Sequence, residues 1–453
     1  MLPSLLHTLH TALTAPRRRT DVAIVGGGVV GTSLAYHLSR HPSSPTVCLV
    51  DRECVGSGAT GLSAGTLYTT LAADATPPPT DAEALAAALD PATAEPDLDV
   101  RLVARTLATL RALEADGYDC GLVECGGLTL LDAPISPELR AEYWDLRRRG
   151  HRIELLTPLR TRALEPAVRA DADDVWALHT PLSAYVDPSM VAQAFADAAV
   201  ASGRVDVVEG VGVVGLERRP SGGPLSTTHA TLALTDGTTH AATTVVLCTG
   251  VGGQALLRDV CGGEDGRVPD DCVLTPVEGT MWTMRPDAPD APALSHIVYT
   301  TGSSEYWRDH PTTPPRCTHA ADGTRLVDHL YGRPLGDGEG GAVFGAGRVP
   351  VVESGTGGAD GGAAARERLA VDVVRRGADA VERRLRLVAD GRDDDGAPVP
   401  GWTGAMPFAS TGRPVVREVR PGVWVVNGFG PKGVMLGPGV TAWVAEVVVG
   451  RRE

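Results

Sequence analysis

The hydrophobic pattern after residue 20 predicts a strand, a helix and a second strand. Residues 21–25 (Asp-Val-Ala-Ile-Val) are a nearly continuous apolar run, which is typical of a buried strand. Residues 32–40 have the spacing of a helix, and residues 46–50 (Thr-Val-Cys-Leu-Val) form a second apolar run that ends at Asp51. The stretch 26–31 (Gly-Gly-Gly-Val-Val-Gly) has the spacing G-x-G-x-x-G. Strand, glycines, helix, strand and acid in this order predict a dinucleotide-binding unit.

The chemistry of such a unit gives each of these positions a task. Gly26 makes the tight turn, Gly28 lets the backbone approach a pyrophosphate, and Gly31 allows the helix to pack closely on the strand. The free N–H groups and positive dipole end at the start of the helix favour phosphate, and Val29, within the glycine motif, is also assigned to the cofactor. Asp51, twenty residues after Gly31, is placed to accept hydrogen bonds from the ribose hydroxyls.

A second loop of small residues follows Asp51 and favours FAD over NAD. A nicotinamide enzyme would normally continue into another β-α unit here. Residues 52–65 instead supply Gly, Ala, Ser and Thr, which let the backbone approach a flat ring and offer N–H and hydroxyl donors. The residues assigned to the cofactor from this loop are Arg52, Gly58, Ala59, Thr60, Ser63, Ala64 and Gly65.

Other parts of the chain carry weaker patterns. Residues 72–97, rich in Ala, Pro and Asp, and residues 353–362, rich in Gly, are expected to be exposed loops or insertions. The charge-dense stretch 382–395 is expected to be a solvated face.

Composition narrows the class of protein. The chain has 453 residues, of which 43% are apolar and 21% charged, so it is long enough for two to four domains and has an ordinary globular composition. Its net charge of −15 argues against binding to nucleic acid or to an anionic membrane. No continuous apolar run approaches the ~18 residues of a membrane span. The eight cysteines are scattered, and the closest pair, Cys120 and Cys125, has no nearby partners that would complete a zinc site, so no metal is predicted.

The first twenty residues have a pattern of their own. They contain no acidic residue, they end in Arg17-Arg18-Arg19, and their leucines fall on one helical face. This is the pattern of an organellar presequence, although a simple N-terminal extension has the same features. We expect residues 1–20 to be a targeting segment and the protein to lie in the mitochondrial or another organellar matrix, with the cytoplasm as the alternative.

From about residue 20 to residue 448 the sequence resembles the D-amino-acid oxidase-like flavoproteins, which include glycine oxidase, sarcosine oxidase and D-amino-acid dehydrogenases. Gly56–Gly65 resembles the family's G-S-G-A-S-G-x-N-A-G loop, and Asn427–Pro438 resembles its G-F-S-G-x-G motif. The other matching stretches, in family order, are Val186–Pro188, Gly210–Leu216, Thr244–Gly250, Pro276–Met281 and Met406–Pro414. Two positions depart from the family pattern: Thr411 stands where an aspartate is usual, and Arg417 where a glycine is usual.

The resemblance adds residues to the cofactor site. It implies that the backbone of Val213 contacts the adenine and that Thr249 and Gly250 end the strand that closes the FAD domain. The terminal motif adds Gly428, Gly430, Pro431, Lys432, Gly433 and Val434. The loop 56–65 contains no His or Cys at the positions that carry covalent flavin in related enzymes. This favours non-covalent FAD, with Cys317 as a remaining alternative attachment point.

The terminal motif also suggests how the protein tunes the flavin. A turn at residues 428–433 leads into a helix expected at residues 434–449. A helix start beneath the pyrimidine end of the ring would stabilise negative charge during reduction. Lys432 in that turn is either a cation near the reduced flavin or dioxygen, or a solvated surface lysine.

Substrate-binding residues are inferred from residues 329–334 (His-Leu-Tyr-Gly-Arg-Pro), which resemble the strand that lines family substrate pockets. Arg333 could pair with a carboxylate through both guanidinium nitrogens, and Tyr331 could add one hydrogen bond. The alternative is that both residues pack at the end of a sheet. Further pocket residues that we weighed, each more easily explained by structure, are Glu278, His296 and Trp402.

The resemblance implies an α/β fold, in which a Rossmann-like FAD-binding domain is interleaved with a substrate domain built on an antiparallel sheet. We expect the FAD-binding domain to be discontinuous, because the family's chain passes twice between the two domains. Its expected segments are 21–70, 185–255 and 400–450, and those of the substrate domain and its insertions are 71–184 and 256–399.

The predicted function is oxidation of the CH–NH bond of an amino acid or N-methyl amino acid by hydride transfer to FAD. The expected partners are a small amino-acid-like substrate and an electron acceptor that is oxygen, a quinone or an electron-transfer flavoprotein. Two alternatives share the fold: a 2-hydroxy-acid dehydrogenase, and a non-catalytic flavoprotein such as a mitochondrial assembly factor.

Overall fold

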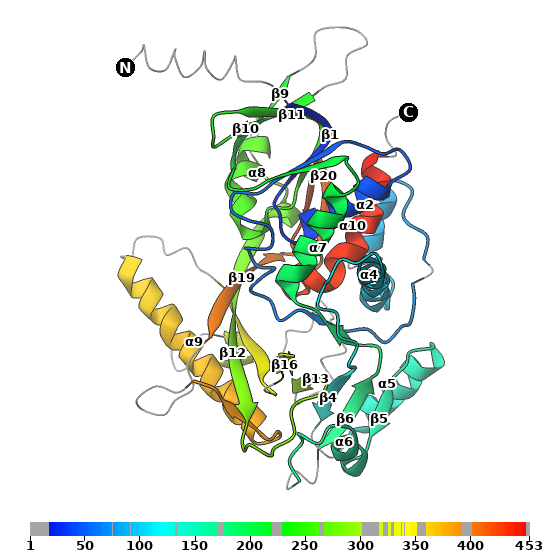
Figure 1. Cartoon of the computed structure of the whole chain (residues 1–453), viewed down its shortest axis with the longest axis vertical. Coiled ribbons are helices and arrows are strands. Elements are labelled where there is room, and N and C mark those ends of the chain that lie inside the picture. Colours follow the sequence, from blue (N-terminus) through cyan, green and yellow to red (C-terminus); the bar gives the residue numbers. More distant parts are fainter. Residues whose placement is uncertain are drawn as a thin grey trace.

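A computed structural model of the chain shows two large sheets, one above the other in Figure 1. The structure describes residues 18–74, 76–90, 92–131, 135–170, 175–219, 229–261, 267–300, 317–319, 325–327, 330–336, 338, 340–350, 359–391 and 401–449. Residues 1–17, most of the predicted targeting segment, lie outside this part of the chain. Residues 18–20, also assigned to that segment, belong to the first strand, which runs along the partner strand farther than the apolar pattern indicates.

The upper sheet has a parallel centre with antiparallel additions. Its strand order is β20-β21-β11-β1-β2-β8, and β9 and β10 extend it from β11. The pairs β1–β11, β1–β2, β2–β8 and β11–β21 are parallel. The strands are β1 (Arg18–Val25), β2 (Val47–Val50), β8 (Val205–Val208), β9 (Val213–Arg219), β10 (His229–Leu234), β11 (Thr239–Leu247), β20 (Val415–Arg420) and β21 (Val423–Asn427).

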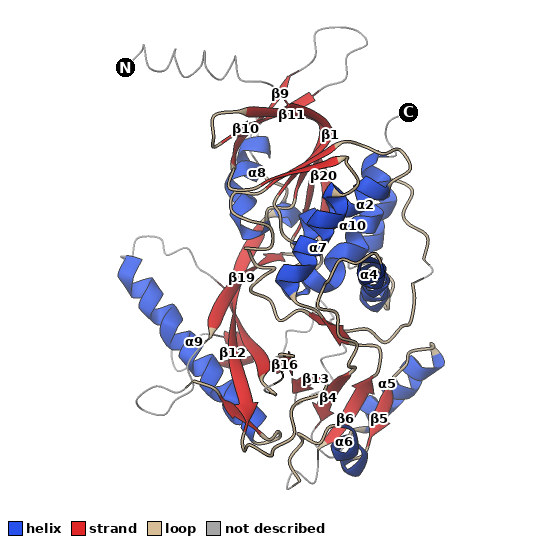
Figure 2. Cartoon of the chain, viewed as in Figure 1, coloured by secondary structure: helices blue, strands red, loops and turns tan. Residues whose placement is uncertain are grey.

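Helices cover this sheet on both sides. Helices α2, α4, α7 and α10 lie together on one side of it, and α8 lies on the other (Figure 2). Their contact faces are apolar, and α10 packs against both α2 and α4. The helices are α2 (Val29–Arg40), α4 (Leu98–Ala115), α7 (Pro188–Val200), α8 (Gln254–Cys261) and α10 (Gly433–Val449).

The lower sheet is antiparallel apart from the pair β13–β4. Its order is β18-β12-β17-β16-β13-β4-β6-β5, and β19 pairs with β12. The strands are β4 (Gly127–Leu131), β5 (Glu154–Leu156), β6 (Trp176–Thr180), β12 (Leu274–Pro286), β13 (Ile297–Thr300), β16 (Leu330–Pro334), β17 (Ala342–Pro350), β18 (Leu387–Ala389) and β19 (Trp402–Ala409). The helices of this half are α5 (Pro137–Arg148), α6 (Pro158–Leu164) and α9 (Ala359–Glu382). Two smaller sheets pair β3 (Thr66–Leu67) with β7 (Ala184–Tyr185), and β14 (Cys317–His319) with β15 (Arg325–Val327).

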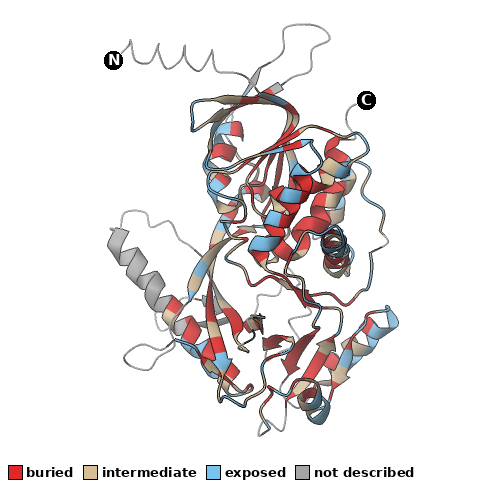
Figure 3. Ribbon diagram, in the orientation of Figure 1, coloured by how far each residue is buried: buried red, intermediate tan, exposed pale blue. Residues whose placement is uncertain are grey.

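These sheets confirm the predicted fold class. The first sheet draws its strands from the three segments expected for the FAD domain, and the second draws most of its strands from the remaining segments. Strand β19 differs, because it lies within 400–450 and yet pairs with β12 of the second sheet. The domain boundaries themselves stay a prediction. Buried positions are concentrated in the sheets and in the faces of the helices that cover them (Figure 3).

Two segments expected to be loops contain helices. Helix α3 (Ala82–Leu89) lies within 72–97; Asp81 caps it by accepting the Ala84 N–H, and its Leu85 and Leu89 are buried. Helix α9 begins at Ala359, within 353–362. The described part of 382–395 includes β18, which pairs with β12 and buries Leu387 and Ala389. Composition alone did not predict these elements. Their few apolar residues are buried against parts of the chain that are distant in sequence.

Candidate functional site

A cavity of about 1590 Å³ lies where the two halves meet. Its upper wall consists of loops at the carboxyl ends of the parallel strands, from residues 25–30, 50–53, 57–66 and 248–253, together with residues 426–427 and 429–436. Its lower wall includes Met281, Tyr299, Leu330 and Tyr331 from the second sheet. Open α/β sheets bind ligands at the carboxyl ends of their strands, so this is the expected place for a dinucleotide.

The first glycine loop has the close contacts that its motif predicts. Gly26 has φ +112°, and a Cβ there would lie 2.3 Å from the Cys248 carbonyl oxygen. A Cβ on Gly31 would lie 1.9 Å from the Gly26 carbonyl oxygen. Gly31 does not line the cavity, so its contribution is the close approach of α2 to the loop.

Asp51 holds this loop from the end of β2. Its Oδ2 accepts a hydrogen bond from the Gly27 N–H at 2.6 Å, and its Oδ1 accepts one from the Glu53 N–H at 2.8 Å. The carboxylate also lines the cavity. Asp51 thus fixes the glycine loop and borders the space where we predict the ribose.

The second loop reaches the start of α2. The Thr60 Oγ1 accepts a hydrogen bond from the Val29 N–H at 3.0 Å, which explains why the helix begins at Val29, three residues before the predicted start. Its N-cap, Gly28, has no capping side chain, and its first turn contains no acidic residue. The Ser63 Oγ lines this cavity and is buried with no hydrogen-bond partner among the described residues.

These features fit FAD. The cavity is large, the first turn of the helix contains no acidic residue, and a buried hydroxyl is left for a ligand to satisfy. Residues 26–30, 51 and 58–65 would hold the dinucleotide, and residues 429–434 would border its ring. When bound, FAD would supply the redox chemistry, and the protein would supply its position and electrostatic surroundings.

The remaining cofactor predictions also fall on the cavity, with one exception. Val213, Thr249, Gly250 and residues 430–434 line it. Gly428 does not; it has φ +74°, and a Cβ there would lie 3.0 Å from the Ala409 Cβ. Gly428 therefore serves the turn between β21 and the short 3₁₀ helix Gly430–Lys432. The predicted roles in FAD binding stay predictions.

Lys432 lines the cavity and is paired. Its Nζ donates to Asp99 Oδ2 at 2.9 Å, and the guanidinium of Arg413 donates to Asp99 Oδ1. Two cations on one carboxylate leave one positive charge in excess. All three side chains lie at the cavity, which sequence reasoning found only for Lys432.

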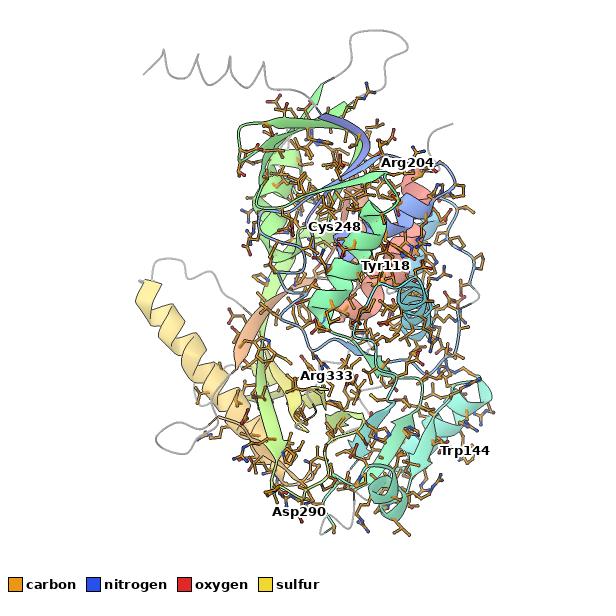
Figure 4. The ribbon with its side chains drawn as sticks, in the orientation of Figure 1. Tyr118, Trp144, Arg204, Cys248, Asp290 and Arg333 are labelled. Atoms are coloured by element: carbon orange, nitrogen blue, oxygen red, sulfur yellow. The ribbon has the colours of Figure 1, made fainter. Side chains whose placement is uncertain are left out.

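Arg333 is not among the residues that line the cavity, and its predicted contact with substrate stays a prediction. Only 9% of the residue is exposed. Its Nε donates to the Ala64 carbonyl, Nη1 donates to the Pro334 carbonyl at 2.8 Å, and the guanidinium lies 4.8 Å from the centre of the Tyr185 ring. Burial lowers the pKa of Arg333. Figure 4 shows Arg333 near the level where the two halves meet, and its bond to Ala64 ties β16 to the second glycine loop.

Tyr331 does line the cavity and belongs to a group of tyrosines that sequence reasoning missed. It lies opposite Tyr299 in the pair β13–β16, and its hydroxyl donates to Met281 Sδ at 3.6 Å. The Tyr299 ring meets the Tyr68 ring edge to face at 5.8 Å. Burial raises the pKa of Tyr68 well above its ordinary value, so this hydroxyl stays protonated. Only the register of β13 with β16 reveals the grouping.

A second missed cluster borders the same cavity. The His151 Nδ1 lies 2.6 Å from Thr70 Oγ1, and its Nε2 lies 3.3 Å from Asp97 Oδ2. Arg149 donates to Asp97 Oδ1 at 2.6 Å. Burial lowers the pKa of His151, although Asp97 acts in the opposite direction.

Three further residues that the sequence suggested for the pocket lie outside the cavity. Glu278, His296 and Trp402 do not line the cavity. His296 Nδ1 lies 3.0 Å from Glu165 Oε2, and the Trp402 indole donates to the Leu62 carbonyl at 3.0 Å. The side chain of Cys317 and residue 329 lie outside the part that the structure describes.

Within the described residues, no group of His, Cys, Asp and Glu side chains could hold a metal ion. One described segment, Gly430–Val449, is long and apolar enough to cross a membrane by length and composition. However, 72% of its apolar window is buried in the fold, and α10 packs between α2 and α4. A core helix accounts for this stretch.

The parallel sheet, the glycine loop and the cavity at the strand ends define a dinucleotide-binding protein. The family model described as FAD dependent oxidoreductase matches residues 21–447, and the chain belongs to that family. This confirms the predicted family, the enzyme class and FAD as the cofactor.

Similar proteins oxidise amino acids, according to their names. Glycine oxidase of Geobacillus kaustophilus (strain HTA426) is 31% identical over 216 residues, which are 48% of this chain and 52% of that protein. The mitochondrial sarcosine dehydrogenase of Homo sapiens is 29% identical over 202 residues, which are 43% of this chain and 19% of that protein. The alignments thus span about half of the first relative and a fifth of the second. The crystal structure of glycine oxidase from Geobacillus kaustophilus matches the fold with a TM-score of 0.59 at 23% identity, over 95% of each chain.

Proposed function

We propose that this protein oxidises the CH–NH bond of an amino acid or N-methyl amino acid, with FAD as the hydride acceptor. The observation that carries the proposal is that the cavity of about 1590 Å³ has two unlike walls. One wall is a glycine-rich backbone suited to a dinucleotide, and the other presents the side chains of Met281, Tyr299 and Tyr331. A small substrate held by the second wall would lie against a flavin held by the first.

The residues of the chain bind the substrate and orient it toward the flavin. Oxidation of a neutral amine by hydride transfer needs no dedicated general base, so the tyrosine wall is chemically sufficient. Tyrosine side chains offer an apolar face and a protonated hydroxyl, which suits a small polar molecule with a C–H bond to present. The names of the two relatives, glycine oxidase and sarcosine dehydrogenase, support an amino-acid substrate.

One charged cluster on the cavity wall supports a carboxylate on that substrate, although the cavity as a whole is lined by more acidic than basic side chains. Since Arg333 is engaged with two backbone carbonyls, we place the partner of a carboxylate at other cations that line the cavity. Arg413 and Lys432 line the cavity and share Asp99, and the excess positive charge of this trio favours an anionic group.

The test is anaerobic mixing of the FAD-loaded protein with glycine, sarcosine, larger D- and L-amino acids, and 2-hydroxy acids. Bleaching of the flavin absorbance by an amino or N-methylamino acid is the expected result. Bleaching only by 2-hydroxy acids would replace the proposal with a hydroxy-acid dehydrogenase. Dithionite serves as the control, because it must reduce the flavin. If dithionite bleaches the flavin and no member of the panel does, the non-catalytic flavoprotein is favoured.

A further inference from the structure

Helix α10 is interrupted close to the cavity. It contains Pro438, which has no N–H to donate and whose ring crowds the carbonyl of Val434, four residues earlier. One residue farther on, the Gly439 N–H donates to Thr106 Oγ1 at 3.1 Å. The same Oγ1 donates to the Met435 carbonyl at 2.8 Å.

In an uninterrupted α-helix the Gly439 N–H and the Met435 carbonyl would be bonded to each other. Here the Thr106 hydroxyl bridges these two groups. It donates a hydrogen bond to the Met435 carbonyl and accepts one from the Gly439 N–H. Insertion of a side chain into the helical hydrogen bonds is a recognised cause of a bend. Thr106 comes from a different helix, α4, more than 300 residues away in the chain.

The packing makes this insertion a fixed feature. Thr106 is fully buried, with 0% of its surface exposed. Gly439 lets α4 come this close, since a Cβ there would lie 2.4 Å from the Leu102 carbonyl oxygen. Asp99, two helical turns before Thr106, holds Lys432 just ahead of α10. One face of α4 therefore fixes α10 and its approach at three levels.

The segment of α10 before the interruption is the part that faces the cavity. Residues 433–436 line it, and the first turn contains no acidic side chain. The positive end of this helix is therefore directed toward the space in which a flavin ring would bind. A change in the direction of this turn would alter the electrostatic environment of the ring without removing any charged residue.

We propose that Thr106 is a positioning residue for the flavin. Its hydroxyl holds the first turn of α10 in the direction that stabilises negative charge on the ring. The inference rests on FAD binding and is independent of which substrate the protein oxidises.

The test compares Thr106→Val, which keeps the shape and loses the hydroxyl, with Thr106→Ser, which keeps the hydroxyl. The matched control is Thr109→Val, because Thr109 lies on the same helix and its hydroxyl bonds only within α4, to the Arg105 carbonyl at 3.1 Å. The measurements are the midpoint potential of bound FAD, its dissociation constant for sulfite and its visible spectrum. None of these depends on turnover.

We expect Thr106→Val to weaken sulfite binding about tenfold or more and to lower the two-electron potential by about 30 mV, which is the same factor. Thr106→Ser and Thr109→Val should stay within about twofold of the parent. An unchanged potential and sulfite affinity in Thr106→Val would overturn the proposal, and so would an equal shift in Thr109→Val.

A second comparison decides the matter if the Val variant does not fold or does not hold FAD. Thr106→Ala removes the hydroxyl and leaves room for water to bridge the two backbone groups. The sulfite affinity of the Ala variant should then fall below those of the parent and of the Ser variant, because a bridging water is held less firmly than a covalently placed hydroxyl. Equal values for Ser and Ala would overturn the role of the hydroxyl.

Discussion

The two walls of the cavity are built in different ways. The FAD-side wall is mostly backbone: glycines at positions where a Cβ would collide, a helix start, and N–H groups held by Asp51 and Thr60. The substrate-side wall is made of side chains, among them Tyr299, Tyr331 and Met281. A wall of backbone can bind the same cofactor in many proteins, whereas a wall of side chains can change its ligand by substitution.

The two walls are also joined. Arg333 belongs to a strand of the substrate-side sheet and donates to the Ala64 carbonyl of the FAD-side loop. Because of this bond, a substitution of Arg333 should affect both walls at once, while substitutions within either wall should affect one.

The largest effect is expected for Gly31→Ala. The added methyl would lie 1.9 Å from the Gly26 carbonyl oxygen, so α2 must shift away from β1. Overpacking costs about 1–3 kcal/mol even where side chains can adjust, and backbone cannot adjust as readily. We expect a lower Tm of the FAD-free protein and loss of bound FAD, measured by thermal unfolding and by absorbance.

Gly58→Ala is the matched control for this substitution. A Cβ on Gly58 has no protein atom within 4 Å, and its φ lies outside the left-handed region. The Tm of the FAD-free protein should therefore be unchanged, and any loss should concern FAD affinity alone. A normal Tm for Gly31→Ala would contradict the prediction, because it would mean that the loop can accommodate the added methyl group next to the Gly26 carbonyl.

The second prediction concerns the joining residue Arg333. Arg333→Leu leaves the Ala64 and Pro334 carbonyls without their donor, and an unsatisfied buried group costs about 1–3 kcal/mol. We expect a lower Tm and a lower FAD content, because the bond that ties β16 to the FAD-side loop is lost. Arg333→Lys should restore part of the loss, since an ammonium cannot reproduce the planar fork over the Tyr185 ring.

Tyr331→Phe provides the comparison for Arg333. It removes a hydroxyl from the cavity wall on the same strand, so its effect should fall on KM with normal FAD content. If Arg333→Leu instead keeps its Tm and FAD and raises KM by orders of magnitude, the substrate role predicted from the sequence is right and the bond to Ala64 is incidental.

The contrast between the walls also explains what the sequence could predict. The unit β1-α2-β2 was predicted to within a few residues, because its glycines and Asp51 act through local backbone geometry. The start of α2 was placed three residues late, since the Thr60 hydroxyl that satisfies the Val29 N–H comes from another loop. Helix α3 was missed because Leu85 and Leu89 are apolar positions in a stretch whose composition resembles a loop.

The substrate-side wall was harder to predict from the sequence than the FAD-side wall. The motif at β16 indicated Tyr331 as a pocket residue, and Tyr331 lines the cavity; strand alternation put Arg333 on the same face. Neither pattern shows that the Arg333 guanidinium has a partner 269 residues away in the chain. The grouping of Tyr68, Tyr299 and Tyr331 depends on strand register, which a single sequence does not reveal.

The third prediction tests the backbone wall through the side chain that supports it. Asp51→Asn replaces a carboxylate that accepts from two N–H groups by an amide with one acceptor oxygen. We expect FAD binding to weaken by about 1–3 kcal/mol, with no binding of NAD in its place. Titration of the FAD-free protein with FAD measures the change. Asp206→Asn, an exposed position on the adjacent strand β8, is the control for loss of one charge. Equal FAD affinity in all three proteins would remove Asp51 from the ribose.

The smallest effect is expected for Lys432→Met, which tests the one cation that the terminal motif supplies to the backbone wall. Loss of the ammonium should make FAD harder to reduce and sulfite binding weaker, because both place negative charge on the ring. The effect should be modest, since Asp99 already pairs with this ammonium and the side chains are partly exposed. Exposed charges of this kind contribute about 0.2–1 kcal/mol, at most about a fivefold change in sulfite affinity. Lys432→Arg should keep the parent value. An unaltered potential and sulfite affinity in Lys432→Met would assign the stabilisation of the ring to the helix start alone, and the FAD-side wall would then act through backbone throughout.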